Sequence, residues 1–334
     1  MSAPPADIVE ALVRLGLLAS EDGVEGAPLT GGVSSDIWRI EAGEGPICAK
    51  RALAKLKVAA DWRAPVERNV YEARWLARAG AAAPEAVPAV LGQDAAAGVL
   101  ALEWLDPADH PTWKAEMLAG RVSPAFAGQV GDALGRIHSA NAIARRPDIA
   151  EDFPTDDIFY AIRLEPYLAA TASAWPAHGD WLQALIRRTA ATKQALVHGD
   201  VSPKNILVGP SGPLFIDAEC AWAGDPAFDL AFCLNHLLLK RIPRPDAAGA
   251  LAESFQALAA AYLARVDWEP ADGVEARAAT LLPALFLARV DGKSPAEYVT
   301  EDADKDMIRR TATALFADRP EKLAAVAAAW RDAR

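Results

Sequence analysis

The pattern of hydrophobic and polar residues changes near residue 105. Between Ala27 and Glu103, alternating apolar and polar positions predict short β-strands, and the stretch WRIEAGEGPICAKRAL reads as two strands joined by a glycine-containing turn. One helix interrupts this pattern, because residues 65–79 begin with a proline, repeat apolar residues at helical spacing and stop at Gly80. Two further strands are predicted at AVLGQD and GVLALEW. We therefore expect a small sheet in the first third of the chain.

After residue 107 the pattern becomes helical and stays so to Arg334. The clear strands in this part are ILV (206–208) and LFID (214–217), which bracket the turn GPSG. The first twenty residues predict an amphipathic helix and lack the basic start of a signal peptide. The expected fold class is α+β with two lobes. The predicted boundaries are an N-terminal lobe at 1–103 with a leading helix, a five-stranded sheet and one further helix, a hinge at 104–107, and a helical C-terminal lobe at 108–334.

Composition excludes several classes of protein. The chain has 334 residues, of which 52% are hydrophobic and 24% charged, and this balance is typical of a globular protein. Its net charge of −11 argues against a nucleic-acid partner, because such proteins neutralise phosphates with Lys and Arg. The three cysteines, Cys48, Cys220 and Cys233, have no metal-binding spacing and fit a reducing, cytoplasmic location. The apolar run AFCLNHLLLK is too short to span a bilayer, so no membrane partner is expected.

The stretch HGDVSPKNILV, followed by LFIDAEC, carries the candidate chemistry. Transfer of a phosphoryl group from ATP needs a carboxylate that orients and deprotonates the attacking hydroxyl, and oxygen ligands that hold Mg²⁺ against the phosphates. The spacing from Asp200 to Asn205 is that of a kinase catalytic loop, with Gly199 where protein kinases carry Arg. Asp200 is the predicted catalytic base. Asn205 and Asp217 are predicted metal ligands, and Glu219 is predicted to bind a second metal ion or its water.

Together, HGDVSPKN, IDAE and GDPAFDLA resemble the aminoglycoside phosphotransferase and choline kinase superfamily, whose fold is similar to that of protein kinases. The resemblance implies that LTGGVSSDIW covers the ATP phosphates. It also implies that Lys50 in CAK pairs with the α/β-phosphates, that Glu72 holds this lysine, and that backbone groups near residue 104 bind the base. Lys55 or Lys57 is the alternative lysine, and Glu67 the alternative partner. The predicted nucleotide-binding residues are Gly31, Gly32, Ser34, Ser35, Lys50, Glu72, Glu103, Trp104 and Leu105.

Other polar residues near these motifs are interpreted as supports. Asp225 precedes a proline as a helix cap, and Asp229 is expected to brace the catalytic loop from behind. His138 and His198 are interpreted as hydrogen-bonded core residues, since a zinc hydrolase built on them and Asp200 has no supporting H-x-H or H-E-x-x-H spacing. The GKS at 292–294 is not a phosphate-binding P-loop, because residue 287 is leucine where that motif needs glycine.

The acceptor is less well defined by the sequence. Candidate contacts are Lys204, Trp222 and Arg289, the last from a polar cluster after an apolar helix. An acidic surface tolerates cationic small molecules. Trp222 and Phe228 suggest a cage for choline, although isolated aromatic residues at this spacing are more often core. Residues 51–73 and the Asp-x-Glu motif resemble methylthioribose kinases, which typically carry serine at the position of Asn205.

The sequence therefore predicts an ATP- and Mg²⁺-dependent kinase that phosphorylates a hydroxyl group of a small molecule of aminoglycoside, sugar or amino-alcohol type. Two alternatives are a methylthioribose-type sugar kinase and a nucleotide-binding regulatory protein without transfer activity. A protein kinase is disfavoured by the missing arginine at Gly199.

Overall fold

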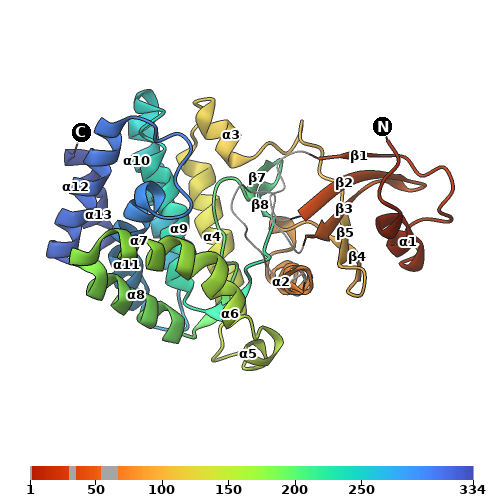
Figure 1. Cartoon of the computed structure of the whole chain (residues 1–334), viewed down its shortest axis with the longest axis horizontal. Coiled ribbons are helices and arrows are strands. Elements are labelled where there is room, and N and C mark those ends of the chain that lie inside the picture. Colours follow the sequence, from red (N-terminus) through yellow and green to blue (C-terminus); the bar gives the residue numbers. More distant parts are fainter. Residues whose placement is uncertain (1, 30–34, 54–66, 334) are drawn as a thin grey trace.

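The N-terminal part of the fold is an antiparallel sheet flanked by two helices. The computed structural model describes residues 2–29, 35–53 and 67–333. The chain begins with α1 (Ala6–Arg14), and the five strands pair in the order β1-β2-β3-β5-β4. Figure 1 shows this sheet with α1 at one end of the molecule and most helices at the other. The strands are β1 (Gly26–Pro28), β2 (Ser35–Ala42), β3 (Gly45–Ala52), β4 (Val90–Asp94) and β5 (Val99–Glu103).

The two faces of the sheet have different partners. Side chains alternate between faces along a strand, and Ile47 and Ala49 of β3 pack against Ile8 and Leu12 of α1. The opposite face of β3 therefore carries Lys50. On that face of the neighbouring strand, buried leucines of β5 join the main core together with residues of α2. The alternation thus directs the lysine toward the helical part of the molecule.

Helix α2 (Arg68–Ala82) extends beyond the C-terminal end that the sequence pattern predicts. Residues 65 and 66 of the predicted helix lie outside the described residues. The predicted stop at Gly80 is wrong, since the helix continues through it and ends at Ala82. Pro84 explains this boundary: a proline disfavours helical geometry in the residue before it, and Ala83 adopts φ −149°. A short 3₁₀-helix, η1 (Pro84–Ala86), follows.

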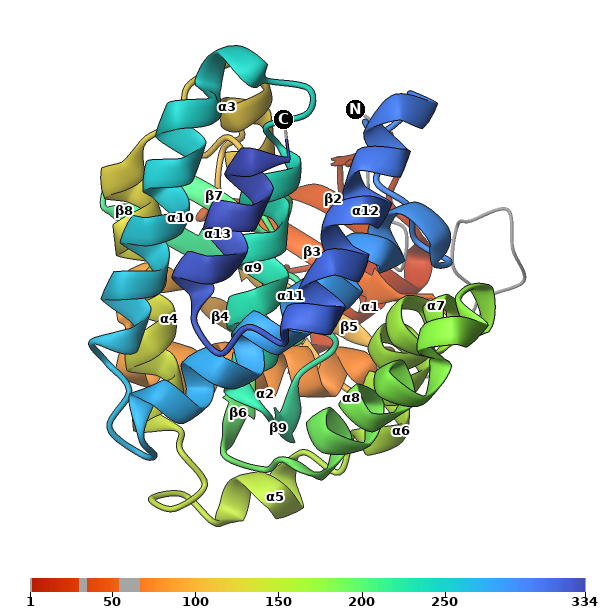
Figure 2. The same cartoon turned by 90° about the vertical axis from the view of Figure 1, so that its left-hand side faces the viewer.

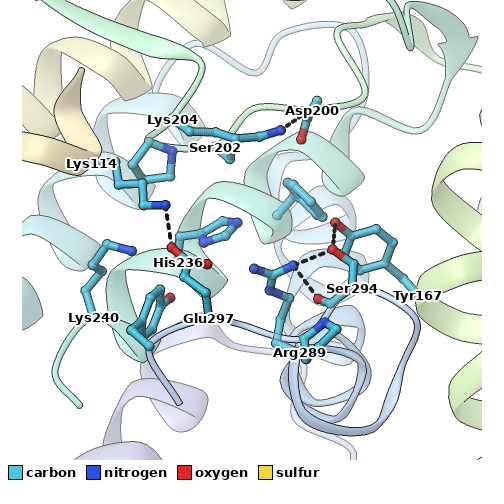
Figure 3. Close-up of a pocket in the computed structure, with 14 residues that line it drawn as sticks. Lys114, Tyr167, Asp200, Ser202, Lys204, His236, Lys240, Arg289, Ser294 and Glu297 are labelled. Atoms are coloured by element: carbon cyan, nitrogen blue, oxygen red, sulfur yellow. Dashed lines mark hydrogen bonds and ion pairs between the residues drawn. The ribbon is translucent and has the colours of Figure 1, made fainter. Parts of the chain in front are cut away.

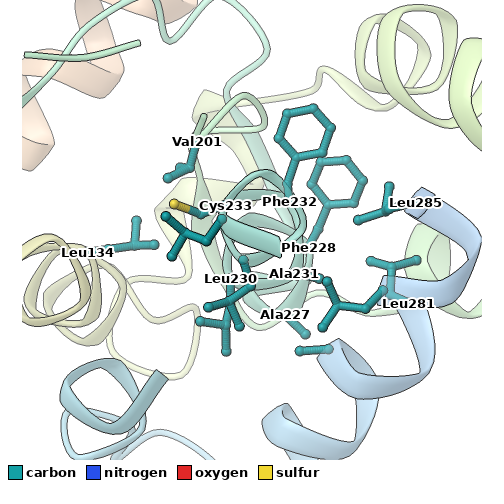
Figure 4. Close-up of a cluster of buried hydrophobic side chains, with 14 of the residues drawn as sticks. Leu134, Val201, Ala227, Phe228, Leu230, Ala231, Phe232, Cys233, Leu281 and Leu285 are labelled. Carbon is teal, nitrogen blue, oxygen red and sulfur yellow. The ribbon is translucent and has the colours of Figure 1, made fainter. Parts of the chain in front are cut away.

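The C-terminal part is mainly helical, as predicted. Helix α9 lies at its centre, and all 14 of its residues are buried. Figure 2 shows α9 near the middle of this part, with α4 and α10 on one side and α7 and α8 on the other. In Figure 4, aromatic and aliphatic side chains of α9 point in several directions toward α4 and α11. No helix in the described ranges is long and apolar enough to cross a membrane.

The helices of this part follow one another with short connections. Those up to residue 191 are α3 (Trp113–Leu118), α4 (Pro124–Ala140), α5 (Asp148–Asp152), α6 (Asp156–Phe159), the π-helix η2 (Tyr160–Ala169), α7 (Ala170–Ala174), the 3₁₀-helix η3 (Pro176–His178) and α8 (Gly179–Ala191). The later ones are α9 (Pro226–Leu239), the 3₁₀-helix η4 (Pro245–Ala247), α10 (Ala248–Leu263), α11 (Ala271–Asp291), α12 (Asp302–Asp318) and α13 (Leu323–Asp332). The predicted α+β class is confirmed.

Two short strand pairs lie among these helices. The predicted hairpin is present as β7 (Ile206–Gly209) and β8 (Gly212–Phe215). A second pair, β6 (Ala195–Val197) and β9 (Trp222–Gly224), was not predicted, so the interpretation of the hairpin as the only clear strand material is wrong. All residues of this second pair are buried, and three-residue strands without polar alternation leave no periodic signal.

The close approach of α4 and α10 depends on a glycine. A methyl group at Gly131 would lie 2.2 Å from the backbone oxygen of Leu258. We expect Gly131→Ala to lower the free energy of unfolding by about 1–3 kcal/mol, because the helices must separate. The control is Gly128→Ala on the same helix, where the nearest atoms lie 3.9 Å away and alanine should be neutral or slightly stabilising. Denaturant unfolding measures both, and equal stabilities would contradict the prediction.

Candidate active site

A lysine and two carboxylates join the sheet to the helical part. The Nζ of Lys50 lies 2.9 and 2.8 Å from the two carboxylate oxygens of Glu72, and it also pairs with Asp217. The predicted contact between Lys50 and Glu72 is confirmed, whereas Glu67 is exposed where α2 begins. Lys55 and Lys57 lie outside the described residues.

Burial and neighbouring charges have opposite effects on the pKa values of Lys50 and Glu72. Burial alone would lower the pKa of Lys50, but the carboxylates of Asp217 and Glu72 outweigh it and raise that pKa well above its usual value. Burial raises the pKa of Glu72 to about 7, against the opposing effect of Lys50. The lysine is therefore cationic and holds Asp217 in place. Asp217 itself adopts φ 67°, a backbone conformation rare for residues other than glycine that often occurs at functional sites.

Asp200 lies at the centre of a second polar cluster. Its carboxylate accepts a hydrogen bond of 2.7 Å from the side-chain amide of Asn205, and it lies 2.8 Å from a guanidinium nitrogen of Arg163 and 3.2 Å from Lys204. The amide of Asn205 also donates to the backbone oxygen of Asp200 at 3.1 Å, so it braces the loop as predicted. These contacts fix the orientation of the Asp200 carboxylate.

Residues behind the catalytic loop hold its backbone. Asp229 of α9 accepts hydrogen bonds from the backbone N–H groups of His198 and Gly199 at 2.7 and 2.8 Å. Asp225 accepts a hydrogen bond from Ala227 and caps α9. Both predicted supporting roles are confirmed. The loop is therefore anchored to a helix whose residues are all buried.

His198 and His138 are core residues, as predicted. The backbone N–H of Asp200 donates to Nδ1 of His198, and the Nε2 of His198 lies 3.1 Å from the backbone oxygen of Ile216. This pattern requires the neutral ring with its proton on Nε2, and burial lowers the pKa of His198 accordingly. His138 contacts the hydroxyl of Tyr262 at 2.8 Å. Among the described residues, no three His, Cys, Asp or Glu side chains are grouped to bind a metal ion.

Arg163 was missed by sequence reasoning. Gly199 has φ 79°, and a Cβ there would lie 2.5 Å from the backbone oxygen of Cys220, so the loop excludes the arginine that protein kinases carry at this position. Arg163 of η2 instead approaches from a distant helix, where its Nε donates to the Gly199 oxygen at 2.6 Å and another nitrogen contacts Asp200. No local motif marks this residue, because it lies 36 positions upstream of Gly199.

Each of the two predicted metal ligands belongs to one of these clusters, Asp217 to that of Lys50 and Asn205 to that of Asp200. The Oδ1 of Asn205 accepts no hydrogen bond from any described residue, and the side chain of Asp217 is 28% exposed. Amide and carboxylate oxygens are the ligands that Mg²⁺ prefers, so this pair fits the ion. Glu219 is buried, and Arg68 donates to one of its carboxylate oxygens, so a second-metal role would require it to exchange that partner.

Only some of the predicted nucleotide-binding residues are among those that the structure describes. Gly31, Gly32 and Ser34 lie outside the described residues. Ser35 begins β2, and its buried hydroxyl has no hydrogen-bond partner among the described residues. Glu103 ends β5 and exchanges hydrogen bonds with Ala89 of the neighbouring segment. Trp104 and Leu105 follow, and neither makes a backbone hydrogen bond to another described residue. Their peptide groups therefore have the capacity to bind a base.

A cavity of about 200 Å³ is lined by Asp200, Ser202 and Lys204 of the catalytic loop, among other residues. Figure 3 shows its lining: the catalytic loop lies on one side, α9 supplies His236, and the chain after α11 supplies Ser294 and Glu297. Lys50, Glu72 and Asp217 do not line it. Asp200 thus faces a small-molecule-sized cavity, while the Lys50 cluster lies elsewhere.

The three predicted substrate residues have different outcomes. Lys204 and Arg289 line the cavity together with Asp200. Trp222 does not, and its prediction is corrected: its ring is 1% exposed, stacks on Phe159 at 4.1 Å and donates a hydrogen bond to Asp156. The pairing of β9 with β6 buries this ring in the core. Phe228 is fully buried as well, so neither aromatic residue forms a cage.

Comparison with known proteins finds a matching family model and related enzymes. A model of the phosphotransferase enzyme family (APH) matches residues 25–238. Methylthioribose kinase of Yersinia enterocolitica is 28% identical over 240 residues, covering 63% of this chain and 58% of that protein. The chain therefore spans less than two thirds of the length of that relative.

Solved structures share the fold at low sequence identity. Choline kinase from Cryptosporidium parvum has a TM-score of 0.54 at 12% identity, covering 93% of this chain and 96% of that one. An aminoglycoside phosphotransferase from Alicyclobacillus acidocaldarius has a TM-score of 0.52 at 17% identity, covering 99% and 97%. These similarities confirm the predicted kinase-like fold with a β-rich N-terminal part and a helical C-terminal part. The family match covers more than half of the sequence, and the chain belongs to the phosphotransferase enzyme family.

Proposed function

We propose that this protein transfers the γ-phosphoryl group of ATP to a hydroxyl group of a small molecule. The observation that carries the proposal is the position of Asp200, which lines the cavity while its carboxylate is held by Asn205 and Arg163. A carboxylate in this position is suited to orient an acceptor hydroxyl and to take its proton as the new bond forms.

The nucleotide would lie on the side of the Lys50 cluster. Lys50, fixed by Glu72, is placed to bind phosphate oxygens, and the segment 104–107 would serve as a hinge whose peptide groups bind the base. Asn205 and Asp217 would hold Mg²⁺, which neutralises charge on the phosphates when bound. Asn205 would then contact the metal ion through its side-chain oxygen and Asp200 through its amide nitrogen.

Methylthioribose is one specific acceptor to test, because the relative that is 28% identical is a methylthioribose kinase. The alternative is a nucleotide-binding regulatory protein without transfer activity. The intact arrangement of Asp200, Asn205, Lys50 and Glu72 favours catalysis over this alternative, since each residue has the partner that catalysis requires.

The proposal is tested by acceptor-dependent ADP release with purified protein, over a panel of sugars, sugar acids, amino alcohols and aminoglycosides. Phosphorus NMR of the product should show a new phosphate monoester. Tight ATP binding without a phosphorylated product from any acceptor would favour the regulatory alternative.

Replacing Asp217 by alanine tests the metal site. We expect Asp217→Ala to weaken Mg²⁺-dependent ATP binding by about 10–100-fold, because outer-shell changes alone have effects of that size. Calorimetric titration of ATP with and without EDTA separates the metal-dependent part of the ATP affinity from the effect of losing the contact between Asp217 and Lys50. Asp246→Ala is the control, since that carboxylate is 63% exposed and pairs only with the nearby Arg244 among the described residues. Equal metal dependence in both variants would contradict the assignment.

A further inference from the structure

The cavity beside Asp200 differs in charge from the protein as a whole. The chain carries a net charge of −11. The cavity, in contrast, is lined by two carboxylates, Asp200 and Glu297, and by four basic side chains, which are Lys114, Lys204, Lys240 and Arg289. The acidic average therefore does not describe the place where an acceptor would bind.

Two of these cations already have carboxylate partners. Lys114 pairs with Glu297, and Lys204 lies 3.2 Å from Asp200. Figure 3 shows Lys204 and Asp200 at the catalytic loop, whereas Lys114 extends from the side of the cavity toward Glu297, which lies near His236. Lys240 and Arg289 line the same cavity on either side of His236 and Glu297 (Figure 3).

Among the described residues, neither Lys240 nor Arg289 forms an ion pair with a carboxylate, although Glu297 lies near enough to raise the pKa of Lys240. Lys240 is 1% exposed, and its Nζ lies over the ring of Tyr298 at 3.9 Å. Arg289 is 7% exposed, donates to the backbone oxygen and hydroxyl of Ser294 at 2.5 and 3.0 Å, and has an Nε without any partner in the described part of the chain. Buried charges are normally paired, because burying an unpaired charge is unfavourable.

The surroundings of these cations disfavour any further positive charge. Burial lowers the pKa of Lys240 to about 7, and Lys114 and Arg289 lower it as well, while Glu297 opposes them. His236 lies between the two cations, and burial together with Arg289 and Lys240 lowers its pKa well below the usual value, so its ring is neutral. In Figure 3 the guanidinium of Arg289 points toward the centre of the cavity. An anion bound there would relieve this repulsion.

We propose that the acceptor is an anionic small molecule whose carboxylate or phosphate group binds between Lys240 and Arg289 while its hydroxyl faces Asp200. This inference rests on the proposed kinase function. A guanidinium presents its N–H groups in a fork that matches both anions, and a lysine adds a point charge. Cationic aminoglycosides and amino alcohols would meet these two side chains unfavourably.

The position of these cations in the sequence explains why the family does not reveal this preference. The family match ends at residue 238, before both Lys240 and Arg289. Lys240 follows the end of α9, and Arg289 lies in the last turn of α11. The family match therefore gives no information about either position.

The anion site is tested first by binding alone. Binding of inorganic phosphate and of acetate is measured by calorimetry in the original protein, in Lys240→Met and in Arg289→Met. The control is Lys305→Met, which removes a lysine from a pair with Asp302 on α12. We expect each cavity variant to weaken the binding of at least one anion about tenfold or more, since each removes a charge-assisted hydrogen bond. Anion binding that is equal in all four proteins overturns the proposal.

The acceptor is tested with compounds of one carbon skeleton, which are glucose, gluconate and glucose 6-phosphate, together with choline, kanamycin and methylthioribose. ADP release should be fastest with an anionic member. Comparison of gluconate with glucose 6-phosphate shows whether the site prefers a carboxylate or a phosphate group. Release with only neutral or cationic acceptors, unaffected by Lys240→Met, overturns the inference and leaves the kinase function intact. Anion binding that depends on Lys240 without ADP release from any acceptor overturns the kinase function instead.

The affinity for the anion should depend on pH. Lys240, with its pKa lowered to about 7, is cationic below that pH and neutral above it. The binding constant of acetate should therefore fall as the pH rises from 6 to 9, and Lys240→Met should flatten this profile. The other charged groups facing Lys240 are Glu297, Lys114 and Arg289. A wild-type profile as flat as that of the variant would contradict the role of Lys240.

Discussion

Replacement of Asp200 by asparagine should lower kcat by about 10²–10⁴-fold, the range typical for loss of a positioned general base. Asparagine keeps the size of the side chain and an oxygen that accepts the hydrogen bond from Asn205. It loses the negative charge and the ability to take a proton from the acceptor. The affinity for Mg·ATP should change little, because Asp200 lines the acceptor cavity and does not contact Lys50.

The measurement combines kcat from ADP release with the dissociation constant of Mg·ATP from calorimetry. Asp246→Asn provides the control, because it makes the same chemical change in an exposed side chain. If Asp200→Asn retained full turnover, Asp200 would not act as the base. If it lost nucleotide binding, the separation of acceptor and nucleotide sides would be wrong.

Replacement of Asp229 by alanine should have the largest effect on stability. The carboxylate of Asp229 is fully buried and is the acceptor for the backbone N–H groups of His198 and Gly199. Hydrogen bonds to a charged group contribute about 1.5–3 kcal/mol each. Losing both should lower the free energy of unfolding by about 3–6 kcal/mol, and turnover should fall as well, because the loop that carries Asp200 loses its support.

Denaturant unfolding gives the stability change, and turnover is measured well below the melting temperature. Asp132→Ala on α4 is the control: its carboxylate is 37% exposed and pairs with Arg265, so its removal should change stability by no more than about 0.5 kcal/mol. Similar stability losses in both variants would show that Asp229 does not support the loop.

The parts of the site within one short motif were predictable from the sequence. Asp200 and Asn205 occur five residues apart in a loop whose geometry follows from their own hydrogen bonds. The contact of Lys50 with Glu72 was predicted through the resemblance, and strand alternation places the lysine on the face that meets α2. In each case a local pattern determines where the side chain points.

Residues brought together by helix packing were not predictable in the same way. Arg163 reaches the catalytic loop from η2, and Lys240 reaches the cavity from the end of α9. Neither belongs to a motif that marks its role: Arg163 stands between Ile162 and Leu164, and Lys240 between Leu239 and Arg241. Trp222 shows the converse error, because its place near the motif suggested a contact that the pairing of β9 with β6 prevents.

The division of the site between two stretches of chain has a consequence for engineering its acceptor. The catalytic loop lies inside the family match at 25–238, and the unpaired cations Lys240 and Arg289 lie after it. Mutations at these two positions change the charge presented to an acceptor without touching the backbone that carries Asp200. If the acceptor binds as proposed, a single substitution at position 240 or 289 would change the acceptor charge that the cavity accepts and leave the catalytic loop intact.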